Sequence, residues 1–152
     1  ALNYNISNRR CVTMVNLITG KNGKGKSKVL LEKVNSQVKE ILGNIVYLDT
    51  STKHMYELNN KIRLINASEY NISSGDMFIG FLLGIISGDH DLQELYFDNF
   101  LSLSHTNVND LESIINQLEE LSKTFGIDIY AAVSTTDGDI PESLKDKVIE
   151  AL

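Results

Sequence analysis

The stretch of residues 12–34 reads VTMVNLITGKNGKGKSKVLLEKV, and it carries the strongest indication of the fold. It opens with Val12 to Thr19, a β-branched and apolar run without polar alternation, which is typical of a strand buried on both faces in a parallel sheet. A second pattern begins near the end of this stretch and continues beyond it. Apolar residues recur there at helical spacing, namely Leu30, Val34, Val38 and Ile41. Gly20 to Ser27 lies between the two patterns, so a glycine-rich turn is expected to join a buried strand to an amphipathic helix.

The turn fits the pattern G-x-x-x-x-G-K-[ST], in which backbone N–H groups curve around phosphate oxygens. Glycine permits the backbone conformations that this curve needs, and the helix that follows adds its positive N-terminus. Lys26 is expected to reach the β and γ phosphates of a nucleotide, and the Ser27 hydroxyl to join a Mg²⁺ shell. The expected cofactor-binding residues are Gly20, Asn22, Gly23, Lys24, Gly25, Lys26, Ser27 and Lys28. The alternative is a flexible surface turn rich in lysine and glycine.

Strands and helices are expected to alternate along the rest of the chain. The further strands are Ile45–Leu48, Ile62–Ile65, Leu95–Phe97 and Ile127–Val133. The helices are a first one that Gly43 ends, a buried one over Met77–Ile86, one that Asn109 caps and Gly126 ends, and a last one from Pro141 to Leu152. This alternation predicts a three-layer α/β/α fold with a mostly parallel central sheet. The expected domain covers residues 12–152, after a loosely ordered leader over residues 1–11.

Length and composition fit one globular domain. The 152 residues are 42% hydrophobic and 22% charged, which argues against a disordered or fibrous chain. The lone Cys11 cannot form an internal disulfide and no signal peptide opens the sequence, so the expected location is the cytoplasm. The longest apolar stretch, Met77–Ile86, is about half the roughly 20 residues that cross a bilayer, so no membrane span is expected.

The net charge of −6 is unevenly distributed. Residues 1–66 hold eleven Lys/Arg and four Asp/Glu, a net +7, whereas residues 67–152 hold three and sixteen, a net −13. The positive charge therefore gathers around the glycine-rich turn. A local positive loop in an acidic protein favours a small polyanion over a long nucleic acid, which draws on many spread phosphate contacts. An unevenly charged solvated surface is the alternative.

Polar residues follow three of the expected strands. Asp49 ends the segment IVYLD, Asp98 ends LYFD, and Ser134 follows Ile127–Val133. Ligands bind beyond the carboxyl ends of the strands in such sheets, so these residues and the glycine-rich turn are expected at one edge. A strand-end or turn role is the alternative for each of them.

The segments VNLITGKNGKGKSK, IVYLD and LYFD together resemble the RecA-like P-loop ATPase core, over most of residues 12–152. The chain is most similar to small bacterial ATP-binding proteins that are loosely labelled twitching-motility ATPases. The resemblance implies ATP and Mg²⁺ as cofactors, with Asp98 as the Walker B aspartate that holds Mg²⁺ through water. It also implies catalytic roles for Lys26, for Asp49 in preparing the attacking water, and for Ser134 as a polar sensor of the γ-phosphate.

Two departures from this pattern concern its catalytic glutamates. Ser51 replaces the glutamate two positions after Asp49, and Asn99 occupies the position after Asp98. Because an amide cannot act as a general base, we expect a Mg²⁺-dependent ATPase with weak intrinsic hydrolysis. A nucleotide-dependent regulatory or partner-binding module without useful turnover is the alternative.

Two further classes rank lower. The loop is similar to the deviant loop of the ParA and MinD ATPases, in which an extra lysine matches Lys21, but Asn22 stands where that pattern has glycine. A small-molecule kinase needs arginines over the phosphates, and Arg63 is the only arginine in residues 12–152. An arginine finger would therefore come from a protein partner, and the assembly state, homo-oligomer included, stays open.

The three histidines are expected at the surface. They are far apart in the sequence and lie in polar stretches, at positions His54, His90 and His105. Such placement favours solvated side chains over metal ligands, so the sequence predicts no histidine-containing metal site.

Overall fold

A parallel sheet forms the centre of the computed structural model, which describes residues 14–152. Within these residues the sheet has six strands in the order β3-β2-β4-β5-β1-β6, and every neighbouring pair is parallel. The strands are β1 (Val15–Gly20), β2 (Asn44–Asp49), β3 (Ile62–Asn66), β4 (Leu92–Phe97), β5 (Asp128–Ser134) and β6 (Val148–Ala151). The four strands expected after β1 are confirmed, and β3 is parallel to β2.

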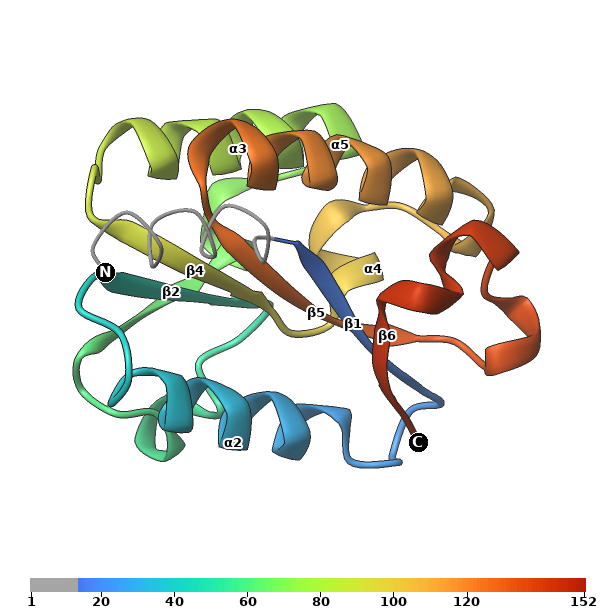
Figure 1. Ribbon diagram of the computed structural model, residues 1–152, viewed down its shortest axis with the longest axis horizontal. Helices are drawn as coiled ribbons and strands as arrows, with labels where there is room; N and C mark the ends of the chain where they lie inside the picture. Colours follow the sequence, from blue (N-terminus) through green and yellow to red (C-terminus); the bar gives the residue numbers. More distant parts are fainter. Residues whose placement is uncertain (1–13) are drawn as a thin grey trace, which may run out of the picture.

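Helices cover both faces of this sheet (Figure 1). One face carries α2 (Lys26–Gln37), whereas the other carries α3 (Gly75–Ser87), α4 (Phe100–Ser104) and α5 (Leu111–Phe125). Each face has its own apolar core, because strands buried on both sides send alternate side chains to opposite faces. The three-layer α/β/α fold is therefore confirmed.

Strand β1 has a neighbouring strand on each side, and all six of its residues are buried. Strand β5 pairs with β1 on one side and with β4 on the other, so it separates the strand that precedes the glycine-rich turn from the strand that ends before Asp98. Because all these strands are parallel, their carboxyl ends share one edge of the sheet. The candidate functional residues follow those ends.

The final helix that Pro141 was expected to begin is absent from the described chain. Glu142–Lys147 forms a 3₁₀ helix, and the residues after it form the edge strand β6 beside β1. Pairing with β1 gives the backbone of this segment hydrogen-bond partners, such as Thr19 O for the N–H of Leu152. This tertiary pairing overrides the local helical pattern.

Helix ends differ from expectation at two places. Helix α2 ends at Gln37 rather than near Gly43, which instead lies where the chain enters β2. A Cβ at Gly43 would clash with the carbonyl oxygen of Asp91 and with the Gln93 side chain, so glycine here permits a close approach of two segments.

The start of α5 also differs from expectation, whereas its end is confirmed. The capping hydrogen bond is accepted by the side chain of Asn107, not by that of Asn109. The backbone N–H of Asn109 donates this bond. A 3₁₀ turn over Val108–Asp110 separates this cap from α5, which is why the cap stands further back than the apolar stripe indicates. Gly126 ends α5 in the left-handed conformation, at φ +66°.

The sequence predicted a buried helix over Met77–Ile86, but α3 buries only one of its faces. Phe78, Leu82 and Ile86 point into the core, whereas Met77 and Leu83 are 46% and 42% exposed. The helix lies on one outer layer, so only one of its stripes meets the sheet. Across the part of the chain that the structure describes, no helix combines the length and apolar character that crossing a bilayer requires.

Candidate functional site

The glycine-rich turn runs from the end of β1 to the start of α2. Gly23 and Gly25 have φ values of +85° and +94°, in the left-handed region that disfavours residues with a Cβ. An added Cβ at either position would meet no atom within 4 Å. The backbone conformation, not lack of space, therefore requires glycine at both positions.

Lys26 is the buried cation of this loop. Its side chain lies under the turn, and its Nζ donates to the carbonyl oxygen of Lys21 over 3.0 Å. Burial lowers the pKa of Lys26 from its ordinary value, and the Asp98 carboxylate opposes that shift. Lys24 and Lys28, by contrast, are exposed. Lys21 is exposed as well, so Lys26 is the one lysine of the loop whose side chain is buried.

Ser27 and Asp98 come together although they lie on different elements. The Ser27 Oγ donates to Asp98 Oδ1 over 3.0 Å, and the Tyr47 hydroxyl donates to Asp98 Oδ2 over 2.8 Å. Burial, and then the Asp98 charge, raise the pKa of Tyr47 well above its ordinary value, so the phenol stays protonated and remains a donor. Asp98 is 4% exposed, and the two hydrogen bonds hold its carboxylate in one orientation.

Asp49 ends β2 next to this pair and is 1% exposed. Its Oδ1 accepts from the Thr50 N–H over 2.7 Å, whereas its Oδ2 is buried without a hydrogen-bond partner among residues 14–152. Burial raises the pKa of the Asp49 carboxyl, and the charge of Asp98 raises it further. A buried carboxylate oxygen without a partner is costly, so this atom is a candidate for contact with a ligand.

The remaining predicted residue, Ser134, meets the loop directly. It pairs with Gly20 in the β1–β5 register, and its Oγ donates to the Asn22 Oδ1 over 2.8 Å. Asn99 adopts the left-handed conformation at φ +55°, and its Nδ2 donates to the Thr50 Oγ1 over 3.5 Å. The ends of β2, β4 and β5 therefore all contact one another or the loop.

His54 is a site residue that the sequence analysis placed wrongly. It was expected at the surface, yet its side chain is 16% exposed and faces the strand ends. Its Nδ1 lies 3.1 Å from Glu57 Oε2 and its Nε2 lies 4.0 Å from Asp98 Oδ2. The sequence carried one signal, a histidine and a glutamate three residues apart shortly after a strand-end aspartate. Only the folded chain brings that pair back to Asp98.

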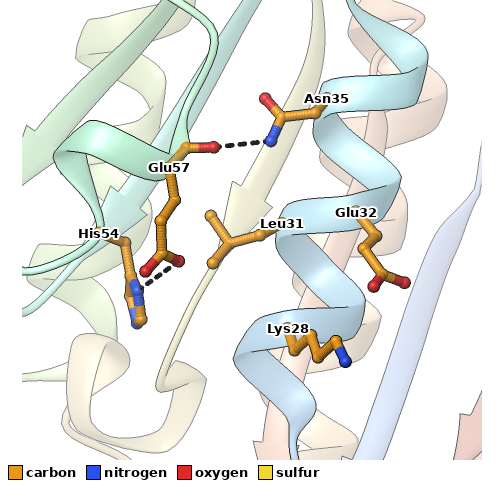
Figure 2. Close-up of a pocket in the computed structure, with 6 residues that line it drawn as sticks. All are labelled: Lys28, Leu31, Glu32, Asn35, His54 and Glu57. Carbon is orange, nitrogen blue, oxygen red and sulfur yellow. Dashed lines mark hydrogen bonds and ion pairs between the residues drawn. The ribbon is translucent and has the colours of Figure 1, made fainter.

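A cleft of about 390 Å³ opens between α2 and the segment that carries His54. Figure 2 shows His54 and Glu57 on one wall and the α2 side chains on the other. The Asn35 Nδ2 donates to the Glu57 carbonyl oxygen over 2.8 Å, which fastens the segment to α2. The full lining is Lys28, Leu31, Glu32, Asn35, His54 and Glu57.

The structure is similar to that of the flagellar accessory protein FlaH from Methanocaldococcus jannaschii. The TM-score is 0.50 at 16% sequence identity, and the match covers 91% of this chain and 70% of that one. The two structures share their overall fold. At this identity the likeness bears on the fold alone. No family model matches the chain, and no curated protein matches it.

Proposed function

We propose that this chain binds ATP with Mg²⁺ through the loop Gly20 to Ser27, in a nucleotide-binding domain over residues 12–152. The observation that carries the proposal is the 3.0 Å hydrogen bond between the Ser27 Oγ and Asp98 Oδ1. It joins the end of the loop to the end of β4, so the hydroxyl and the carboxylate of the proposed magnesium site meet where a bound triphosphate would lie.

The residues present fit the proposed ligands. Mg²⁺ prefers hard oxygen ligands and few of them from the protein, so the Ser27 hydroxyl would supply one directly and the Asp98 carboxylate would hold the ion through water. Left-handed glycines, a helix N-terminus and the Lys26 ammonium suit phosphate oxygens. When bound, Mg²⁺ would neutralise phosphate charge. No N/TKxD guanine signature occurs in the sequence, which supports adenine over guanine.

We propose weak intrinsic hydrolysis, with Asp49 as the carboxylate that prepares water. Its Oδ2 is buried without a partner among the residues described and lies beside the proposed magnesium site. The two positions where related ATPases hold a glutamate are Ser51 and Asn99, neither of which takes up a proton. Ser134 would act from the far side of the loop, where it already contacts Asn22.

A second candidate is a nucleotide-dependent switch without useful turnover. The contact between Asn99 and Thr50 favours it, because this contact links the residue after Asp98 to the segment that begins after Asp49. A bound triphosphate that contacts either residue would shift the conformation of the segment after Asp49. A protein partner, or a second copy of the chain, would then read the segment or supply an arginine.

Thermal unfolding with ATP or GTP, with and without Mg²⁺, tests the binding proposal. A ligand at a hundred times its dissociation constant stabilises a protein by about 2.7 kcal/mol, so a clear rise in melting temperature is expected with ATP and Mg²⁺. Lys26→Ala should abolish the rise, whereas Lys39→Ala, an exposed lysine just beyond α2, should retain it. Equal stabilisation of wild type and Lys26→Ala would disprove the proposed site.

Phosphate release distinguishes the two candidate functions. The ATPase predicts release above background that Asp49→Asn removes while ATP still raises the melting temperature. The switch predicts ATP binding with release no faster than in Lys26→Ala. In that case, an ATP-dependent change in proteolysis of residues 50–59 would support the switch.

A further inference from the structure

We infer that Asp49, His54 and Asp98 form a binding site for a divalent transition-metal ion, distinct from the proposed magnesium site and independent of nucleotide. Each residue offers one ligand atom, and the three atoms lie within 4.8 Å of one another. In a tetrahedral Zn²⁺ site with ligands about 2.1 Å from the ion, the ligand atoms lie about 3.4 Å apart. The 4.0 Å between His54 Nε2 and Asp98 Oδ2 is about 0.6 Å longer, a difference that side-chain rotation around a bound ion would close.

Two atoms of this cluster lack the partners that buried polar groups normally have. Asp49 Oδ2 and His54 Nε2 are both buried, and neither has a hydrogen-bond partner in residues 14–152. Asp49 is 1% exposed, so bulk water has little access to its Oδ2 and does not readily donate a hydrogen bond to it. One cation among these side chains would satisfy both orphaned atoms at once.

The orientation of His54 also suits a metal ligand. A carboxylate only accepts hydrogen bonds, so the 3.1 Å contact between Nδ1 and Glu57 Oε2 places the imidazole proton on Nδ1. In the neutral imidazole that a metal ion binds, the lone pair would then lie on Nε2, the atom that faces Asp98. A carboxylate behind a histidine is the arrangement that orients imidazole ligands in metal sites. Glu57 is itself positioned by α2, through the bond from Asn35 to its carbonyl oxygen.

The donor set selects the class of ion. One imidazole nitrogen and two carboxylate oxygens suit Zn²⁺, Mn²⁺ or Co²⁺, whereas Mg²⁺ prefers oxygen ligands alone. The two sites use different sides of Asp98, because Oδ1 faces the Ser27 hydroxyl and Oδ2 faces His54. Three protein ligands also leave room for water or substrate in the fourth position.

Charge and access are compatible with the site. Three carboxylates, of Asp49, Asp98 and Glu57, surround the imidazole, and the buried cation acting on Asp98 is Lys26. A divalent ion therefore enters a region of net negative charge. The cleft in Figure 2 has His54 and Glu57 on one wall, so it borders the proposed site on its His54 side.

The test is a calorimetric titration of the nucleotide-free chain with Zn²⁺ alone. It is done in a Cys11→Ser background, because a free thiol is a competing zinc ligand. We expect one Zn²⁺ per chain, and at least tenfold weaker binding in His54→Ala and in Asp49→Asn, which keeps the acceptor for the Thr50 N–H. Glu57→Gln should weaken binding by about 10- to 100-fold, as loss of a partner behind a metal-bound histidine does.

His90→Ala is the matched control, because His90 is exposed and outside the cluster. Folding of each variant is checked by circular dichroism. Unchanged Zn²⁺ affinity in both folded variants, His54→Ala and Asp49→Asn, would overturn the inference. So would the absence of Zn²⁺ binding by the folded parent, or displacement of Zn²⁺ by millimolar Mg²⁺.

Ser27→Ala separates this inference from the nucleotide proposal. Ser27 contributes no atom to the cluster, so the variant should keep Zn²⁺ binding even where it loses the Mg²⁺ dependence of ATP binding. Conversely, a chain that binds ATP and Mg²⁺ but no Zn²⁺ would retain the proposed function and refute the second site.

Discussion

The Ser27 hydroxyl donates to Asp98 Oδ1 over 3.0 Å across 71 residues of sequence. The first turn of α2 and the end of β4 are brought together at the carboxyl edge of the sheet, although β5 lies between β1 and β4. Asp98 is held from its other side by Tyr47, so the carboxylate is fixed before any ligand arrives. Such pre-organisation lowers the cost of binding a cation there.

Ser27→Ala should remove the Mg²⁺ dependence of ATP binding. The variant loses one oxygen ligand and frees Asp98 Oδ1. We expect the affinity for ATP with Mg²⁺ to fall at least tenfold, about 1.4 kcal/mol, while the affinity without Mg²⁺ changes little. Calorimetric titration with and without Mg²⁺ measures both. Ser36→Ala, an exposed serine on the same helix, is the control, and equal losses in both variants would contradict the prediction.

Gly25→Ala should destabilise the chain even though a methyl group fits in the space. The residue sits at φ +94°, where a Cβ costs about 1–2 kcal/mol. Gly84→Ala should have the opposite effect on stability, because Gly84 lies in the interior of α3 with nothing within 4 Å of an added Cβ. There the change should stabilise by about 0.5–1 kcal/mol. Urea unfolding of both variants checks the pair, and a stabilised Gly25→Ala would show that the loop lacks the left-handed turn.

Glu94 should make stability depend on pH. Burial raises the pKa of its carboxyl, and the Asp128 charge adds to this, against hydrogen bonds from Tyr96 and Gln37. A raised folded pKa means that the folded chain binds the proton more tightly. This contribution to stability is present in full below the unfolded pKa, and it is lost as the pH rises through the folded pKa.

We therefore expect wild type to lose more unfolding free energy than Glu94→Gln between about pH 5 and pH 7.5. Urea unfolding at the two pH values measures the difference for each protein. Glu120→Gln, at an exposed position of α5, should behave as wild type. A difference in Glu94→Gln as large as in wild type would assign the pH dependence to other groups.

Phe78 should be the more costly of two apolar truncations on α3. It is fully buried and packs edge-on against Phe97 and Phe100, with ring centroids 5.3 and 5.9 Å away. Phe78→Ala should cost about 3–5 kcal/mol. Leu83 is 42% exposed on the same helix, so Leu83→Ala should cost less than about 1 kcal/mol. Chemical denaturation of the two variants gives the comparison, and similar costs would mean that the outer face of α3 is also packed.

The loop and its neighbours were predictable because their signals are local. Val15 to Gly20 forms a fully buried strand, and the residues after it form the turn and helix that the motif indicates. The strand-end positions of Asp49, Asp98 and Ser134 followed from the same reasoning, since parallel strands end at one edge. Their catalytic and metal-binding roles stay predictions.

The errors share a different cause. The segment after Pro141 carries a helical pattern, yet its last residues pair with the edge of β1 that β5 leaves free and form β6. Met77–Ile86 is apolar all round, yet it lies on an outer layer where only Phe78, Leu82 and Ile86 reach the core. In each case the outcome depends on which surface a segment meets, and that surface is built by residues far away in sequence.

The alternation of strands and helices and the glycine-rich turn between β1 and α2 follow from the sequence alone, because hydrophobic periodicity and glycine conformations act over a few residues. Only the tertiary structure decided that His54 leaves the surface and faces Asp98 with an unsatisfied nitrogen. That placement depends on Glu57 and Asn35, through contacts that form only when α2 packs against the segment after β2. Distances between such side chains follow from the packing of whole elements, which no local pattern encodes.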